Sequence, residues 1–366
     1  MAKSDVGAYA RSDKVNSVVF RGFDNHIYEL FLRLGASQWE FGGSLSTLAG
    51  APAAAGHPAG YARSDQINAV VYRGVDNHIC ELFLAAGWRV NDLSAIAGAP
   101  LAAGDPAAHV RHDRYNSVVY RGVDNHIYEL FLPWDAQAVF GLFPWNFGDL
   151  SAITGAPLAA GNPAGYVRGD NANSVVYRGF DNHIYELSLP SGASAWNLSD
   201  LSARAGAPPA QGDPAGYQRS DFVSSVVYRG FDNHIHELYL VLSATPAWHA
   251  EDLSAAAMKS LGSWPEDAAG DPAGYVCSDS VNSVVYRGVY NNVAEFSLPD
   301  GATAWKVGDL DTFGAPLAAG VPATYVRSDN VNSVLYRGVD NHIYEFFRLG
   351  PRWDFGDLSR GIREAQ

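Results

Sequence analysis

The clearest copy of a repeated unit reads Tyr166-Val167-Arg168, then Asn173-Ser174-Val175-Val176-Tyr177-Arg178-Gly179, then Asp181-Asn182-His183-Ile184-Tyr185-Glu186-Leu187. It continues to Trp196 and Asp200-Leu201-Ser202 and ends in the connector Gly206-Ala207-Pro208. The opening aromatic position recurs at spacings of 52, 48, 57, 51, 58 and 50 residues, at Tyr9, Tyr61, His109, Tyr166, Tyr217, Tyr275 and Tyr325. A period near fifty with several short β-like runs per unit is typical of a β-propeller. We therefore predict an all-β fold, a seven-bladed β-propeller with four-stranded antiparallel blades.

The seven units use the whole chain of 366 residues. Because each unit contacts mainly its neighbours and the ring closes on itself, we expect a single domain over residues 1–366. The units fall at approximately residues 7–58, 59–106, 107–163, 164–214, 215–272, 273–322 and 323–366. A feature of the repeat therefore recurs around the ring, which favours multivalent binding over a single catalytic centre.

The composition excludes several classes of protein. The net charge of −14 argues against nucleic-acid binding, which depends on clustered Lys and Arg. No apolar run of eighteen residues occurs, so we expect no membrane insertion, and the first five residues lack the apolar core of a secretory signal. We expect a cytoplasmic protein or one secreted without a classical signal peptide. Cys80 and Cys277 lie in units two and six, and we expect two free thiols.

Each unit contains four strand-like runs separated by turn residues. In the first unit, the second run is Ser17-Val18-Val19-Phe20-Arg21, and the third is His26-Ile27-Tyr28-Glu29-Leu30-Phe31-Leu32. The fourth run extends from Trp39 towards Ser44-Leu45-Ser46. Gly22-Phe23-Asp24-Asn25 is a hairpin signal. Antiparallel order then places the Asp-Asn-His turn and the Pro/Gly connector on one face of the disc, and the Ser-Asp turn and the loop before the fourth run on the other.

Two charged positions recur in every unit at a constant separation of eight residues. The arginines end the second run, at Arg21, Arg73, Arg121, Arg178, Arg229, Arg287 and Arg337. The glutamates lie in the third run, at Glu29, Glu81, Glu129, Glu186, Glu237, Glu295 and Glu345. We expect each pair to lie close together across the hairpin. The pairs are either structural ion pairs between blades or, outside unit six, groups that hold sugar hydroxyls in a cleft between blades.

A tryptophan opens the fourth run of every unit, at Trp39, Trp88, Trp145, Trp196, Trp248, Trp305 and Trp353. One tryptophan per blade is often simple core. An indole at a strand start beside a loop is also a platform for the apolar face of a sugar ring. Both interpretations remain open, and all seven tryptophans are candidate sugar-binding residues.

Histidine follows Asp-Asn in six units, at His26, His78, His126, His183, His234 and His342. Asp-Asn alone is explained by the turn, whereas no hairpin geometry requires an imidazole. The histidine either donates to a neighbouring backbone carbonyl or contacts a ligand. Unit six has Tyr290-Asn291-Asn292 at this turn, so a site that uses the turn is altered there.

We expect no metal, cofactor or catalytic residues. The histidines are distributed one per unit without ligand spacing, and no calcium loop is present. No nucleophile elbow or phosphate loop stands out either. Hydrolysis of glycosides needs two carboxylates in different environments, whereas Asp and Glu recur almost identically in each unit.

With these motifs laid out, the chain resembles the Photorhabdus lectin family over essentially its whole length. The resemblance rests on Arg-Ser-Asp, Asn-Ser-Val-Val-Tyr-Arg-Gly, Asp-Asn-His-Ile-Tyr-Glu-Leu and the Gly-Ala-Pro, Ala-Ala-Gly, Pro-Ala-Gly-Tyr connector. It implies a lectin with several sites between blades that binds L-fucose and related or O-methylated sugars. It also implies fucosylated or O-methylated glycans of host cells as partners and assembly into a homo-oligomer. His109, Cys277 and Tyr290 depart from the pattern in units three and six.

A second interpretation is a protein-interaction propeller scaffold without sugar binding. Its partner surface would be an apolar excursion, either residues 133–145 around Trp134 or residues 258–266 around Trp264. These excursions are also candidates for oligomer contacts.

Overall fold

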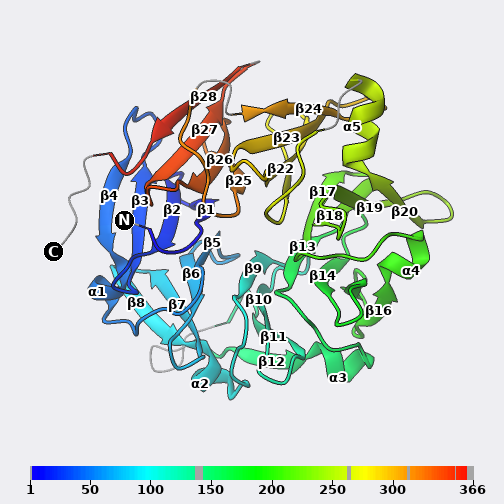
Figure 1. Cartoon of the computed structure of the whole chain (residues 1–366). Helices are drawn as coiled ribbons and strands as arrows, with labels where there is room; N and C mark the ends of the chain where they lie inside the picture. Colours follow the sequence, from blue (N-terminus) through cyan, green and yellow to red (C-terminus); the bar gives the residue numbers. More distant parts are fainter. Residues whose placement is uncertain (1, 137–142, 262–264, 311–313, 351, 361–366) are drawn as a thin grey trace.

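The computed structural model describes residues 2–136, 143–261, 265–310, 314–350 and 352–360. Its strands form seven four-stranded antiparallel sheets, each built from strands in chain order. The sheets are arranged radially around an axis, with the first strand of each sheet innermost (Figure 1). The predicted all-β, seven-bladed propeller is confirmed.

The bounds of the strands are nearly the same from blade to blade. Blades 1 to 4 consist of β1 (Gly7–Ala10), β2 (Asn16–Arg21), β3 (Ile27–Leu32) and β4 (Glu40–Ser44); β5 (Ala59–Ala62), β6 (Asn68–Arg73), β7 (Ile79–Leu84) and β8 (Trp88–Asp92); β9 (Ala107–Val110), β10 (Asn116–Arg121), β11 (Ile127–Leu132) and β12 (Asn146–Asp149); β13 (Ala164–Val167), β14 (Asn173–Arg178), β15 (Ile184–Leu189) and β16 (Asn197–Asp200). Blades 5 to 7 consist of β17 (Ala215–Ser220), β18 (Val223–Arg229), β19 (Ile235–Val241) and β20 (Ala247–Asp252); β21 (Ala273–Val276), β22 (Asn282–Arg287), β23 (Val293–Leu298) and β24 (Lys306–Asp309); β25 (Ala323–Val326), β26 (Asn332–Arg337), β27 (Ile343–Arg348) and β28 (Trp353–Asp357).

The turn between the second and third strands explains the Asp-Asn pair. Asn25 has a φ of 64°, and the equivalent Asn of each other blade is also left-handed. Asn tolerates this conformation better than most residues. Asp24 Oδ1 accepts the backbone N–H of His26 at 3.1 Å, which closes the turn from inside.

Among the described residues, a helix follows the fourth strand in five blades: α1 (Leu45–Ala49), α2 (Leu93–Ala97), α3 (Leu150–Thr154), α4 (Leu201–Ala205) and α5 (Leu253–Leu261). The expected continuation of the fourth strand through Leu45-Ser46 is therefore wrong. The chain turns because Ser44 caps the helix through the Thr47 N–H, and left-handed Gly50 ends it. Ser46 Oγ then accepts the Ile27 N–H at 2.9 Å, which fixes the helix to the third strand. No described helix has the length and apolar character needed to cross a membrane.

The ring closes without exchanging a strand between blades, since β1 lies beside β25 and each blade uses consecutive strands. The N-terminal segment acts as the connector of blade 1. Ala2 N donates to Asn341 O at 3.0 Å, as Ala54 N donates to Asn25 O at 2.8 Å in the next blade. The ends of the ring are thus joined by the bond that joins every other pair of neighbours.

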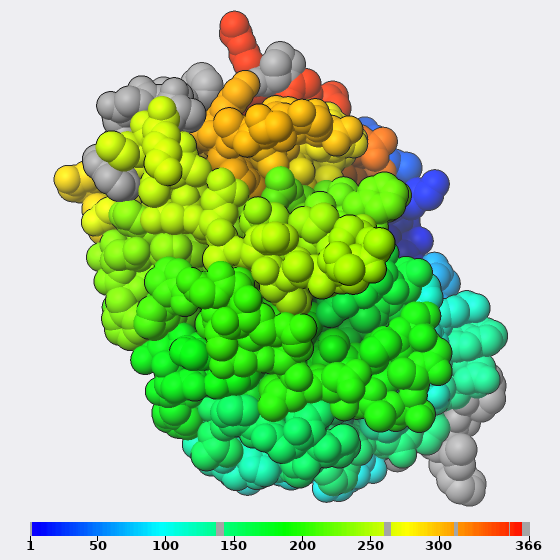
Figure 2. Space-filling model, turned by 90° about the vertical axis from the view of Figure 1, so that its right-hand side faces the viewer, coloured from blue at the N-terminus to red at the C-terminus, as the bar shows by residue number. Residues whose placement is uncertain are grey.

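The hydrophobic core is divided among the seven boundaries between blades, which we call seams and number by their blades. Each apolar cluster combines the second and third strands of two neighbouring blades. The rim view shows consecutive blades as successive bands of colour lying against one another (Figure 2). Because Tyr, Val, Leu and Ile side chains from both sides fill the seams, the seams hold the disc together.

Cys80 and Cys277 are buried and free, which confirms that expectation.

Candidate functional site

The two faces of the disc carry different groups, as the strand order predicted. On the connector face, the Asn25 carbonyl of the Asp-Asn-His turn accepts Ala54 N from the connector at 2.8 Å. On the other, turn face, the Arg-Ser-Asp turns of one blade meet the next blade, where Ser12 N donates to Asn68 Oδ1 at 2.8 Å. This separation decides which candidate residues can act together.

The histidines lie on the connector face, far from the tryptophans. In five blades the Nδ1 of the histidine lies 2.7–2.9 Å from the carboxylate that caps the following helix or turn. In blade 1, which has Ser44 in place of this Asp, His26 Nδ1 lies 3.3 Å from Thr47 Oγ1. The expected backbone carbonyl partner is therefore wrong, and the true partner is a side chain. Trp39 precedes β4, and Ser44, next to His26, ends it. About five residues at roughly 3.3 Å each therefore separate the indole from the histidine.

The second-strand arginines also belong to the connector side. Arg21 lies opposite Ile27 at the end of the β2–β3 hairpin, whereas Glu29 lies opposite Val19. Arg21 Nη1 donates to Asn25 Oδ1 at 3.0 Å, and the same bond recurs in the other blades. The predicted pairs Arg21–Glu29, Arg73–Glu81, Arg121–Glu129, Arg178–Glu186, Arg229–Glu237 and Arg337–Glu345 are therefore wrong.

In six blades the glutamate instead faces the arginine that ends the first strand or begins the turn after it. In blade 7, Arg327 Nε and Nη2 donate to Asp329 at 3.1 and 2.6 Å, and Arg327 Nη1 lies 3.6 Å from Glu345 Oε1. The equivalent Arg–Glu contacts lie at 3.0–3.4 Å in blades 1 to 5. The arginine precedes its glutamate by 18 residues in each case, at Arg11, Arg63, Arg111, Arg168, Arg219 and Arg327.

The tryptophan of the following blade completes this network. Trp39 Nε1 donates to Glu345 Oε2 across seam 7/1 at 3.1 Å, and Trp353 Nε1 does the same to Glu295 across seam 6/7. Ser333 Oγ donates to the other oxygen of Glu345 at 2.6 Å. Both carboxylate oxygens are therefore occupied, and burial raises the pKa of Glu345 even with Arg327 beside it.

All seven glutamates are buried, which favours their structural interpretation. At seam 7/1, Glu345 orients the arginine and the indole and offers no free oxygen to a solute. The groups that remain accessible at a seam are the turn aspartate, part of the guanidinium and part of the indole. Asp329 is 29% exposed, for example, and Trp39 is partly exposed. The Arg-Ser-Asp motif is visible in the sequence, but its position at the seams, beside the buried glutamate, was not predicted.

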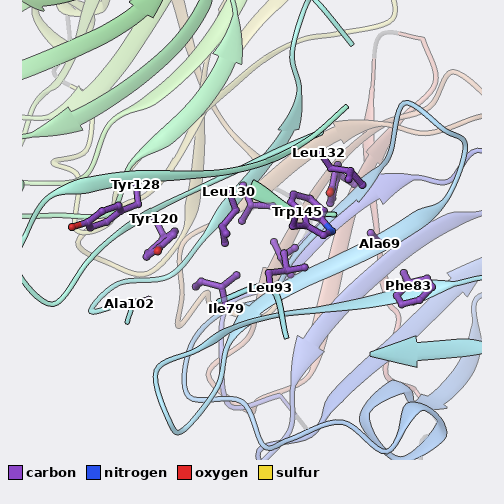
Figure 3. Packing of buried hydrophobic residues seen from close by; sticks show 13 residues of the cluster. Ala69, Ile79, Phe83, Leu93, Ala102, Tyr120, Tyr128, Leu130, Leu132 and Trp145 are labelled. Atoms are coloured by element: carbon purple, nitrogen blue, oxygen red, sulfur yellow. The ribbon is translucent and has the colours of Figure 1, made fainter. Parts of the chain in front are cut away.

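The tryptophans divide into two groups. Those partly exposed are Trp39, Trp88, Trp196, Trp248 and Trp353. Trp145 and Trp305 are 3% and 2% exposed. Figure 3 shows Trp145 packed among Leu93, Leu130 and Leu132 at seam 2/3. Phe143, which comes from the excursion of blade 3, lies 4.5 Å from the Arg63 guanidinium and helps to close this seam. Stacking of a sugar is therefore sterically open at five seams.

Blade 6 lacks the seam arginine, since Cys277 stands at its position. Arg348 of blade 7 supplies a guanidinium from the opposite side of seam 6/7. Its Nη2 donates to Asp279 Oδ1 at 3.3 Å, and its guanidinium carbon lies 5.2 Å from the Trp353 ring. The seam therefore keeps its charge pattern despite the substitution.

A group of possible metal ligands occurs in blade 5, where Asp232, His236 and Asp252 place ligand atoms within 4.8 Å of one another. His236 replaces a tyrosine that in blades 1, 3, 4 and 7 donates to the same turn aspartate. His236 Nε2 lies 3.1 Å from Asp232 Oδ1 and so takes over that contact. The arrangement is explained by the turn, without a metal.

His109 occupies the tyrosine position of the innermost strand in blade 3. Its two ring nitrogens are buried without partners, and burial lowers the pKa of His109 to about 4. The unfolded chain therefore binds a proton near pH 6.5 that the folded chain does not bind until about pH 4. This group thus stabilises the fold above pH 6.5, and that contribution is lost as the pH falls towards 4.

The variant His109→Tyr tests this assignment. We expect the free energy of unfolding of the wild type to fall between pH 6.5 and 4 by up to about 3 kcal/mol more than that of the variant. Urea titrations followed by tryptophan fluorescence at several pH values measure the difference. Parallel pH profiles for the two proteins would show that His109 does not titrate differently in the folded state.

Solved structures with this architecture include several lectins. The chain is similar to the BP39L lectin from Burkholderia pseudomallei, with a TM-score of 0.73 and 14% identity over 97% of this chain and 98% of that one. It is also similar to AofleA from Arthrobotrys oligospora, with a TM-score of 0.52 and 14% identity over 83% and 86% of the chains. A point mutant of the Aleuria aurantia lectin, solved in complex with Fucα1-6GlcNAc, gives a TM-score of 0.51 and 13% identity over 96% and 94%. At 13–14% sequence identity, these structural similarities show a shared fold alone. No protein-family model and no curated protein matches the sequence.

Proposed function

We propose that this protein is a multivalent lectin that binds L-fucose and related or O-methylated sugars or galactose at its seams. The observation that carries the proposal is the partly exposed indole at five seams of one face, which lies beside a guanidinium and its aspartate at seams 7/1, 3/4 and 6/7. An indole offers a flat apolar surface to the C–H face of a sugar, and the charged groups bond its hydroxyls. The similarity to a lectin solved with a fucosylated disaccharide agrees with this chemistry.

The resemblance to the Photorhabdus lectins supports the same proposal and extends it. On this basis we propose host-cell glycans as partners, a homo-oligomer as the assembled form, and a cytoplasmic protein or one exported without a classical signal peptide. The acidic charge of −14 and the absence of a basic cluster in the sequence agree with a neutral ligand.

The described residues of a seam supply binding groups but not the pair of unlike carboxylates that glycoside hydrolysis needs. At seam 7/1, for example, Glu345 is buried with both oxygens occupied, and the turn aspartate Asp329 is engaged by Arg327. Both carboxylates therefore act as fixed acceptors. This favours binding without turnover.

The scaffold alternative has one accessible feature among the described residues. Trp134 is 45% exposed and lies 4.1 Å from the Arg114 guanidinium carbon. Residues 137–142 of the same excursion, and Trp264 of the other, lie outside the described residues. Replacing Trp134 by serine is expected to leave sugar binding intact and, if the alternative holds, to abolish capture of a protein partner.

Calorimetric titration with methyl α-L-fucoside tests the proposal. We expect saturable heat at millimolar sugar, with several sites per chain, because each seam contributes few contacts. Its mirror image, methyl α-D-fucoside, is the matched control and should give weaker binding. Equal heats of dilution for the two sugars, together with no agglutination of fucosylated cells, would refute the proposed function.

A further inference from the structure

Six of the seven seams are closed on the turn face by one kind of hydrogen bond. A backbone N–H in the turn of one blade donates to a side-chain oxygen at the start of the next blade's second strand. The distances are 2.7–2.9 Å, from Ser12 to Asn68, Ser64 to Asn116, His112 to Asn173, Gly169 to Ser224, Ser278 to Asn332 and Ser328 to Asn16. This bond holds the turn of one blade against the next blade, so that the turn covers the seam.

Seam 5/6 lacks this bond among the described residues. Asn282 is the equivalent acceptor in blade 6, and it is 8% exposed. Its Oδ1 has no hydrogen-bond partner, while its Nδ2 donates to Leu298 O at 3.4 Å. A buried carbonyl oxygen without a donor is energetically unfavourable, so a ligand that supplies a donor is favoured there.

The cause lies in one residue of the blade 5 turn. The third residue after the seam arginine is left-handed in the six other blades, at Lys14, Gln66, Arg114, Asn171, Ser280 and Asn330, with φ of 61–67°. Blade 5 has Phe222 there, and a bulky side chain disfavours that conformation. The strands β17 and β18 instead extend until Ser220 pairs with Val223, with a register shift between Gln218 and Ser220. The turn no longer reaches Asn282.

The displaced turn leaves a pocket of about 420 Å³ between blades 5 and 6. Arg219, Asp221 and Val223 line it from blade 5, and Asn282, Leu298 and the loop of residues 299–302 line it from blade 6. Its volume falls within the range of roughly 300–1,000 Å³ that is usual for small-molecule sites.

The same displacement releases Arg219. In blades 1 to 4 and 7 the seam arginine donates two bonds to the aspartate two residues later. Among the described residues, Arg219 bonds only Glu237, through Nη1 at 3.3 and 3.2 Å. Its Nε and Nη2 donors are therefore available on the wall of the pocket.

We propose that this pocket is a sugar-binding site in which Asn282 and Arg219 select the ligand. It is distinct from the sites at the five seams that have a partly exposed tryptophan. The inference rests on the proposed function. A hydroxyl group donates to Asn282 Oδ1 and another sugar oxygen accepts from Arg219, while Val223 and Leu298 contact the apolar edge of the ring. The exposed carboxylates of Asp221 and Asp300 disfavour an anion, so the ligand is a neutral saccharide. Trp305 lies buried behind Arg219 and is not the platform here.

The variant Phe222→Asn tests the inference. We expect the turn to adopt the left-handed form, Ser220 N to bond Asn282 Oδ1, and the pocket to close. Calorimetry with methyl α-L-fucoside should then report one site fewer per chain, with the midpoint of thermal unfolding unchanged or higher. Gln66→Phe is the matched converse in blade 2, whose seam 2/3 has a buried tryptophan, and there we expect the turn to open and one site to be gained.

The possible failures are distinguishable. No binding of the fucoside by the wild type refutes the proposed function. Wild-type binding with the same number of sites in Phe222→Asn overturns only the assignment of this pocket. If that variant does not fold, a wild-type crystal soaked in the fucoside gives the answer, since sugar between Arg219 and Asn282 supports the inference and an unoccupied pocket beside occupied indole seams overturns it.

Discussion

Replacing Glu81 by glutamine is expected to lower the free energy of unfolding by about 3 kcal/mol. Arg63 and Glu81 are both fully buried at seam 2/3 and lie 3.3 Å apart. Removing one charge of a buried pair leaves the other uncompensated, at a cost of roughly 3–5 kcal/mol. Asp65, 2.6 Å from Arg63 and partly exposed, compensates some of that charge, so we expect the lower end of the range.

Glu40→Gln provides the matched control for this substitution. Glu40 pairs with Arg33 on the surface, where the side chains are 43% and 61% exposed. Exposed pairs contribute about 0–1 kcal/mol. Urea unfolding monitored by circular dichroism compares the two variants with the wild type. Equal losses in both would mean that the buried Arg63–Glu81 pair contributes no more to stability than the surface pair.

The second large effect is expected in avidity. A single seam offers one partly exposed indole and few polar groups, so its affinity for a free monosaccharide is low. Several seams open on one face of the disc, and simultaneous engagement can raise the apparent affinity about 10²–10⁴-fold. We therefore expect a dense fucosylated surface to bind the protein about 10²–10⁴-fold more tightly than free methyl α-L-fucoside does.

Surface plasmon resonance on fucosylated chips of graded density measures this effect. The apparent dissociation constant should rise towards that of the free sugar as the spacing between sugars exceeds the reach of one disc. An apparent affinity that is independent of density would contradict multivalent binding, even if each seam bound sugar.

The blades could be predicted from the sequence because their determinants are local. Left-handed Asn25 in the hairpin and the β-branched pair of the second strand depend only on neighbouring residues, and they recur in seven and six units, respectively. The one-turn helix α1 was missed because five residues are too short for a helical period. Only its Ser or Asp cap and its terminal glycine indicate it.

The partner of the seam glutamate could not be chosen from spacing alone. Arg21 precedes Glu29 by eight residues, a separation that recurs in all seven units, and Arg11 precedes it by 18, a separation that recurs in six. Strand register decides between them, since Glu29 lies opposite Val19 and not opposite Arg21. The predicted strand order was enough to show that the histidines and the tryptophans lie far apart, because they follow turns on opposite faces of the disc.

Individual seams differ from one another through single substitutions, and the consensus of the repeat does not show these differences. Phe222 changes the turn of blade 5, and the position of Arg348 in blade 7 restores the charge that Cys277 removes. Both effects act between blades, across roughly fifty residues of sequence. They depend on how neighbouring blades lie against each other, which a single unit of the sequence does not specify.

A crystal structure of the protein soaked in methyl α-L-fucoside is the most direct measurement of the central claim. We expect sugar on the turn face, in contact with the indoles of Trp39, Trp88, Trp196, Trp248 and Trp353, and none at Trp145. Sugar bound only on the connector face, beside the histidines, would contradict it.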